Sequence, residues 1–162
     1  MDYCSPFGVL SIIVGNGILQ KCIWKKSNLN SGTPADGNSE YERSEENIEV
    51  LNLTINVLDF YFKEGYIPDE LLKEIIAKSA IRYDNSFIDA ITGIPPGTTI
   101  SYCSLAERLG KPAMTRGLGR ILALNDHVII IPCHRIIRRN GTIGGYNGGT
   151  DIKEALLQHE LR

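Results

Sequence analysis

Cys133 and His134 are adjacent in the motif Pro132-Cys133-His134-Arg135, and together they could carry out nucleophilic chemistry. A free thiol with a pKa of about 8.5 is mostly protonated at neutral pH, whereas the thiolate is the nucleophile. A base must therefore remove its proton, and the His134 imidazole could do so directly or through a water. The imidazole needs an acceptor that fixes its tautomer, and Glu160 is our candidate.

Two other interpretations of this motif remain open. Cys133 could be a small buried apolar residue beside a surface histidine. A zinc site would need further ligands, and the spacing of His127, Cys133 and His134 matches no standard zinc-binding pattern, so we predict no metal site. The start of the chain does not resemble a secretion signal, so we expect free thiols rather than disulfides at Cys133 and at the three remaining cysteines. These are Cys4, Cys22 and Cys103.

The charge is distributed unevenly along the 162 residues. Residues 91–162 hold nine lysines and arginines against five acids, a net charge of +4, whereas the rest of the chain nets −6 to give the total of −2. A basic half on an acidic protein suits an anionic partner such as DNA. No apolar run approaches the roughly 20 residues that span a bilayer, and the acidic start does not resemble a signal peptide, so we expect a cytoplasmic protein without a membrane partner (nuclear in a eukaryote).

The first half of the chain predicts strands followed by helices. Residues 8–14 and 18–24 form two strands of a hairpin, because Asn16-Gly17 between them tolerates positive φ. The polar stretch 27–49 predicts a long loop. Apolar spacing predicts a helix over 48–63, and residues 69–79 also fit helical spacing.

The second half predicts short helices around a helix-turn-helix. A helix over 86–91 with Ser86 as its cap is followed by the rigid turn 93–97, so we divide the chain into domains 1–79 and 80–162. Helices over 101–109 and 113–124, joined through Gly110, form the helix-turn-helix. The second contains Gly117 and Gly119, which cost roughly 1 kcal/mol each relative to alanine, so a packed helix or a DNA backbone should approach that face. The remaining predicted elements are a buried strand over 128–131, a glycine-rich loop over 144–149 and a helix over 152–161.

Several of these stretches, in order, resemble the O6-alkylguanine-DNA alkyltransferase (methylated-DNA–protein-cysteine methyltransferase) family. The resemblance runs from about Ile94 to Glu160, which makes it far more specific than a single Cys-His pair. It departs from the family at Asp126, where a proline is usual, and at Asn147, where a small hydroxyl residue is common. The matching segments are Ile94-Pro95-Pro96-Gly97-Thr98-Thr99-Ile100-Ser101-Tyr102, Ile131-Pro132-Cys133-His134-Arg135-Ile136-Ile137 and Gly145-Tyr146-Asn147-Gly148-Gly149.

The resemblance implies an α+β fold and a catalytic set. A ribonuclease-H-like sheet-and-helix domain would precede a mostly helical, winged-helix-like domain. Cys133 would accept the alkyl group, with His134 acting through a water and Glu160 orienting it. Asn125 would hold the hinge before the Cys133 segment, and Tyr146 would close over the flipped guanine and help to protonate or polarise the leaving base.

The resemblance also implies how DNA is bound. Arg116 would enter the base stack in place of the extruded base, and Tyr102 would press on the target phosphate. The second helix would enter the minor groove, which carries little sequence information and so suits a protein that finds damage in any context. The predicted DNA-contacting residues are Arg116, Tyr102, Ala113, Thr115, Gly117, Arg135 and Asn147.

The predicted activity is therefore stoichiometric DNA repair by a monomer that needs no cofactor. The alkyl group of O6-alkylguanine, and also of O4-alkylthymine, would pass irreversibly to Cys133, after the base has been flipped out of the duplex. Two alternatives remain: a module that binds alkylated DNA without transfer, and an unrelated hydrolytic enzyme using Cys133 and His134. Each would be recognised by the absence of an alkyl group on Cys133 after incubation with damaged DNA.

Overall fold

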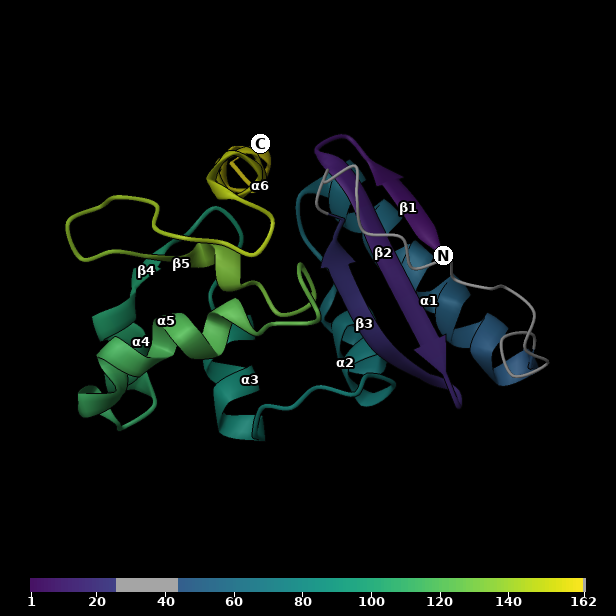
Figure 1. Ribbon diagram of the computed structural model, residues 1–162, viewed down its shortest axis with the longest axis horizontal. Helices are drawn as coiled ribbons and strands as arrows, with labels where there is room; N and C mark the ends of the chain where they lie inside the picture. Colours follow the sequence, from purple (N-terminus) through teal and green to yellow (C-terminus); the bar gives the residue numbers. More distant parts are fainter. Residues whose placement is uncertain (26–43, 162) are drawn as a thin grey trace.

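The computed structural model describes residues 1–25 and 44–161, which form an α+β fold (Figure 1). Three antiparallel strands start the chain, β1 (Asp2–Ser5), β2 (Gly8–Gly15) and β3 (Ile18–Trp24). The predicted hairpin is confirmed, because β2 pairs with β3 and the turn residues Asn16 and Gly17 have φ of 55° and 67°. The short edge strand β1 was not predicted from the sequence.

Helix α1 (Glu45–Glu64) packs against β2 and β3, and α2 (Asp69–Ala77) packs against α1. Ser44 caps α1 by accepting a hydrogen bond from the Asn47 amide, and Gly65 ends it in the left-handed region at φ 82°. The helix predicted over 48–63 is confirmed, but it starts earlier, so the predicted loop 27–49 is wrong for residues 45–49. Residues 27–43 of that loop lie outside the described residues.

Helix α3 (Asn85–Thr92) is capped by Asp84, which accepts from the Phe87 amide at 2.8 Å. The predicted cap Ser86 is wrong, because its hydroxyl instead donates to the Asp84 carboxylate at 2.6 Å. The carboxylate is the better acceptor for a helix N-terminus, since it is charged and opposes the positive end of the helix dipole.

The predicted pair of helices is present as α4 (Tyr102–Arg108) and α5 (Thr115–Ala123). Ser101 caps α4, and Gly110 turns the chain at φ 65°. The second helix begins later than predicted, because Pro112–Met114 form a separate 3₁₀ turn, η2. The two helices contact each other directly, as a helix-turn-helix requires.

Three short elements and one helix complete the second half. Strand β4 (Ile100–Ser101) pairs in parallel with β5 (Ile136–Ile137). The 3₁₀ turn η3 (Cys133–Arg135) leads directly into β5, and α6 (Thr150–His159) ends the fold, lying above η3 and β5 in Figure 1. The predicted C-terminal helix is thus confirmed, with Glu160 as its cap residue.

Residues 128–131 are buried as predicted but do not form the predicted strand. Ile129 has φ 75°, and the Ile131 amide donates back to the His127 carbonyl at 2.9 Å, which closes a tight turn. The Asn125 side chain bonds to both ends of this turn, so a local side-chain interaction prevails over the strand propensity of the apolar run.

Two cores lie on either side of this turn. The first joins the sheet, α1 and α2 with Val128, Ile129 and Ile130. The second joins α3, α4 and α5 with Ile131 and Cys133. The chain around Cys133 thus belongs to both halves of the molecule. Among the helices of the described residues, none is long and apolar enough to cross a bilayer.

Candidate functional site

Cys133 lies at the start of η3, in the wall of a pocket of about 740 Å³ between α4, α5 and the 138–147 loop. Only 5% of the residue is exposed, and its thiol is free. Burial raises the pKa of the Cys133 thiol, although the Asn125 hydrogen bond and the charge of Lys153 act in the opposite direction. The pocket is lined by Tyr102, Cys103, Thr115, Arg116, Gly119, Leu122, Ala123, Cys133, Arg138, Arg139, Gly145, Tyr146 and Asn147.

Asn125 holds the Cys133 sulfur and the preceding turn. Its side-chain oxygen accepts from the His127 amide at 3.0 Å, so its NH₂ group faces the other way. That NH₂ donates to the Ile131 carbonyl at 2.9 Å and to the Cys133 sulfur at 3.1 Å. A donor aimed at sulfur favours the thiolate over the thiol.

His134 and Glu160 form a fully buried pair, with Nε2 2.7 Å from the Glu160 Oε1. A carboxylate can only accept, so the proton of the ring is on Nε2 and the lone pair of the neutral ring is on Nδ1. Burial lowers the pKa of His134, which keeps the ring neutral. Nδ1 is buried and has no partner among the described residues, so it is available as an acceptor.

Arg135 is directed into the protein, and its predicted contact with DNA is wrong. Its Nε and Nη2 donate to the Glu160 carboxylate at 3.0 and 2.9 Å, and its Nη1 donates to the Ile94 carbonyl at 2.6 Å. The residue is only 6% exposed. Burial alone would raise the pKa of Glu160, but His134 and Arg135 outweigh it and lower that pKa to about 2.

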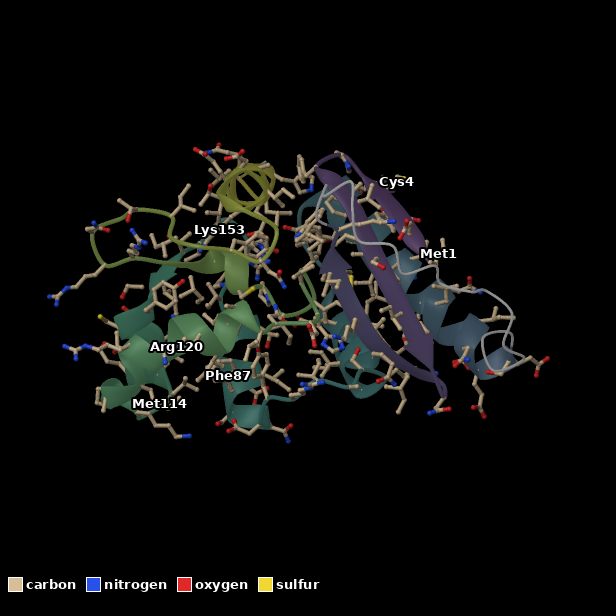
Figure 2. All side chains as sticks on the ribbon, in the orientation of Figure 1. Met1, Cys4, Phe87, Met114, Arg120 and Lys153 are labelled. Atoms are coloured by element: carbon tan, nitrogen blue, oxygen red, sulfur yellow. The ribbon has the colours of Figure 1, made fainter. Side chains whose placement is uncertain are left out.

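Two further residues of this cluster, Tyr61 and Lys153, were not predicted from the sequence. Tyr61 of α1 donates to the Glu160 carboxylate at 2.9 Å. Lys153 is fully buried (Figure 2), and its side chain reaches from α6 to β5, where it donates to the Ile136 carbonyl at 2.5 Å. Burial lowers the pKa of Lys153 to about 8. The sequence did contain one indication that Lys153 is buried: it lies three residues before Leu156 and so shares the apolar face of its helix.

The glycine-rich loop brings Tyr146 and Asn147 to the same pocket. The Tyr146 ring lies edge-on to His134, with ring centroids 6.3 Å apart. The Asn147 side chain donates to the Asn125 carbonyl at 3.3 Å. The Tyr146 hydroxyl accepts from the indole N–H of Trp24 at 3.1 Å, a contact from β3 that the sequence did not suggest.

Helix α5 and the turn before it form the opposite, open side of the pocket. Arg116, Gly117 and Ala113 are exposed, whereas Thr115 and Tyr102 are half-buried. A Cβ added at Gly117 or Gly119 would meet no atom within 4 Å. Of the two explanations offered for these glycines, a packed helix is therefore excluded among the described residues, and the surface faces open space.

The predicted catalytic residues Cys133, His134, Glu160, Asn125 and Tyr146 thus lie together, and Arg116, Thr115, Tyr102 and Asn147 line the same pocket. Ala113 and Gly117 lie beside it without lining it. Of the seven predicted DNA-contacting residues, only Arg135 is buried in the protein interior. In the part of the chain that the structure describes, no group of three or more metal-binding side chains occurs.

Residues 82–162 match the family model described as the 6-O-methylguanine DNA methyltransferase, DNA binding domain. A methylated-DNA–protein-cysteine methyltransferase of Methanosarcina acetivorans is 32% identical over 127 residues, 74% of this chain and 81% of that protein. The protein of the same name from Salmonella typhimurium is 46% identical over 71 residues. That match covers 44% of this chain and 42% of the Salmonella protein, so it spans less than half of that relative.

The fold is also similar to a solved structure, that of Mycobacterium tuberculosis OGT in complex with DNA. The TM-score is 0.73 with 24% sequence identity, and the match covers 99% of this chain and 91% of that one. At this identity the likeness establishes the α+β fold.

Proposed function

The chain belongs to the O6-methylguanine DNA methyltransferase family, and we propose that it repairs DNA by moving the alkyl group of O6-alkylguanine onto Cys133. The observation that carries this proposal is the Cys133 sulfur in a pocket wall, beside the buried His134–Glu160 pair. In the transfer, a bond forms between the sulfur and the alkyl carbon while the bond from that carbon to O6 breaks. The thioether product is stable, so each molecule repairs one lesion.

The proton of the thiol is proposed to move to Nδ1 of His134 through a bridging water. Nδ1 carries the lone pair because Nε2 donates to Glu160, and the Glu160 charge stabilises the ring once it is protonated. Arg135 and Tyr61 hold the carboxylate in place through their own hydrogen bonds. The Asn125 NH₂ group and the Lys153 charge stabilise the thiolate that forms.

The leaving guanine keeps the electron pair of the broken bond and takes up a proton. Tyr146 is proposed to close over the flipped base and to donate its hydroxyl proton to it. The proton held by His134 then replaces the one lost by Tyr146, whose ring lies beside the imidazole, so that in sum one proton passes from the thiol to the guanine. Asn147 lines the same region and can donate a further hydrogen bond, a role that a small hydroxyl residue has in the family pattern.

DNA is proposed to bind across α5, with the helix in the minor groove. The open surface at Gly117 and Gly119 supports this, because small residues allow a DNA backbone or groove to approach closely. Arg116 would fill the space left by the flipped base, and Tyr102 would press on its phosphate. Ala113 and Thr115 would contact the groove beside it.

We propose the finer description of the fold and substrate range on the same basis. The sheet with α1 supports a ribonuclease-H-like first domain over residues 1–79, and the α4–α5 pair supports a winged-helix-like second domain over 80–162. The first core also contains Val128, Ile129 and Ile130, so the two domains share one interior surface. We also propose that the protein acts as a monomer and that it accepts O4-alkylthymine as a second substrate.

Mass spectrometry of the intact protein and of its proteolytic digest tests the function directly. After incubation with duplex DNA containing O6-methylguanine, the peptide holding Cys133 should gain the mass of one methylene group, with one equivalent per molecule. Cys133→Ala should abolish the gain. The matched control is Cys103→Ala, because Cys103 lines the same pocket and its loss should leave the gain intact.

Binding of the damaged duplex without any gain in mass would identify a non-catalytic damage-binding protein instead. Repeated turnover of an ester or peptide substrate would identify a thiol hydrolase. Either result would overturn the proposed transfer.

A further inference from the structure

Trp24 is the single tryptophan of the chain, and it joins the first half of the molecule to the loop that closes the pocket. It lies at the end of β3 and is 4% exposed. Its indole nitrogen is 3.1 Å from the Tyr146 hydroxyl, across a sequence separation of 122 residues. An interaction this distant in sequence fixes where the loop lies relative to the sheet.

The indole ring also packs against the backbone of the same loop. A Cβ built at Gly148 would lie 2.5 Å from Cδ1 and 2.7 Å from Cγ of the Trp24 ring. Only glycine allows this approach, since real Cβ atoms do not come within 3.0 Å of such a neighbour. The ring therefore contacts the loop on both sides of Asn147, at Tyr146 and at Gly148.

The direction of the hydrogen bond follows from the chemistry of indole. An indole N–H can only donate, so the Tyr146 oxygen accepts and its own O–H remains available for a second partner. Within the described residues, Trp24 is the sole hydrogen-bond partner of this hydroxyl. Burial and the nearby Cys133 raise the pKa of Tyr146, whereas the hydrogen bond from Trp24 lowers it.

We propose that Trp24 is a positioning residue for alkyl transfer, which holds the Tyr146 ring in the pocket wall and leaves the Tyr146 hydroxyl proton free to be donated. This inference rests on the proposed function of the Cys133 pocket. Trp24 is not among the residues that line the Cys133 pocket, so its effect passes through Tyr146, which is. The first half of the chain thereby contributes to the chemistry of the second.

A double-mutant cycle tests this proposal with Trp24→Phe, Tyr146→Phe and the double variant. Phenylalanine keeps an aromatic ring at position 24 and removes the N–H donor. The first-order rate constant of transfer at saturating O6-methylguanine duplex should fall roughly two- to tenfold in Trp24→Phe, the range expected for one hydrogen bond. The affinity for the unmodified duplex should stay unchanged.

The decisive result is the rate constant of the double variant. If Trp24 acts through the Tyr146 hydroxyl, Trp24→Phe should have no further effect on the rate constant in the Tyr146→Phe background. An unchanged rate in Trp24→Phe, or the same fold-loss in both backgrounds, would overturn the proposal in favour of a purely structural role. Urea denaturation of all four proteins checks that each is folded under the assay conditions.

A second measurement does not depend on repair activity. Because Trp24 is the only tryptophan, the tryptophan fluorescence comes from this one side chain and reports its surroundings. Removing its hydrogen-bond partner in Tyr146→Phe should therefore shift the emission in the protein without DNA. An unshifted emission would contradict the hydrogen bond itself. If wild-type protein fails to transfer an alkyl group but the emission shifts, the proposed function fails while the contact stands.

Discussion

Arg116 and Arg135 carry the same charge, but one faces solvent and the other is buried. Arg116 is exposed at the start of α5 and lines the pocket. Arg135 is 6% exposed, with its nitrogens bonded to Glu160 and to the Ile94 carbonyl. A buried cation needs a partner within the protein, whereas an exposed one beside a pocket is available to an external anion. The inner side of the pocket thus fixes the reactive groups, and the outer side remains open for DNA.

The largest expected effect comes from removing the negative charge of Glu160, which neutralises the buried Arg135 on the inner side of the pocket. Glu160→Gln leaves the Arg135 guanidinium buried without a counter-ion, so the free energy of unfolding should fall by about 3–5 kcal/mol. Alkyl transfer should also be lost, because the neutral amide cannot stabilise a protonated His134. Urea denaturation measures the first effect and the mass of the alkylated protein measures the second.

The matched control for this variant is Glu154→Gln, an exposed acid on the same helix, which should change neither property. If Glu160→Gln proved as stable as Glu154→Gln, Arg135 would have another counter-ion, and the contrast between the two arginines would disappear.

A second test of the inner side uses pH. The pKa of Glu160 is lowered from 4.5 to about 2, so its stabilising contribution is complete above pH 4.5 and is lost as the pH falls toward 2. The loss should reach about 3 kcal/mol, at 1.36 kcal/mol for each pKa unit. His134 acts in the same direction, because its pKa is lowered from 6.5 and the unfolded state gains a proton that the folded state does not.

Urea denaturation between pH 7 and pH 3 should therefore show a continuous decrease in stability. The decrease below pH 4.5 should be smaller in Glu160→Gln, since that variant has no carboxyl to titrate. A flat profile in the wild-type protein would contradict the buried ionised pair.

On the outer side, Arg116→Ala should leave stability unchanged and slow repair. Unstacking a base costs a few kcal/mol, and a side chain that fills the gap offsets part of this, so the rate constant for duplex DNA should fall roughly tenfold or more. Arg108→Ala removes the same charge from an exposed site outside the pocket and provides the control. Equal losses in the two variants would show that only net charge matters.

The smallest expected effect is at Gly119, where an added methyl group meets nothing within 4 Å. Gly119→Ala should therefore raise the free energy of unfolding by up to about 1 kcal/mol, through helix propensity. It should also weaken DNA binding if the helix surface lies in a groove, measured as a higher Kd for a duplex. A gain in stability with unchanged affinity would mean that DNA does not approach this glycine.

The sequence predicted the elements whose patterns are local. The Asn16-Gly17 hairpin, the amphipathic α1 and the two helices around Gly110 follow from turn chemistry and apolar spacing, and the structure confirms them. The order of motifs around Cys133 likewise predicted which side chains to look for at the pocket.

Interactions between distant residues could not be predicted in this way. Arg135 looks in the sequence like any cation of a DNA-binding protein, because nothing local shows that Glu160 and the Ile94 carbonyl converge on it. Trp24 and Tyr61 were missed for the same reason, since their partners lie about 100 residues away or more. The run 128–131 was misjudged because the Asn125 side chain, rather than backbone propensity, determines its shape.

The interior position of Val128, Ile129 and Ile130 limits how the chain could be divided. These residues belong to the segment matched by the family model, yet they fill the core built by the opening sheet and α1. A truncated protein beginning at residue 82 would expose this hydrophobic turn to water. It would also remove the hydrogen bond that Tyr61 donates to Glu160. Residues 82–162 therefore do not form an independent folding unit, and transferring them to another protein would require the opening sheet as well.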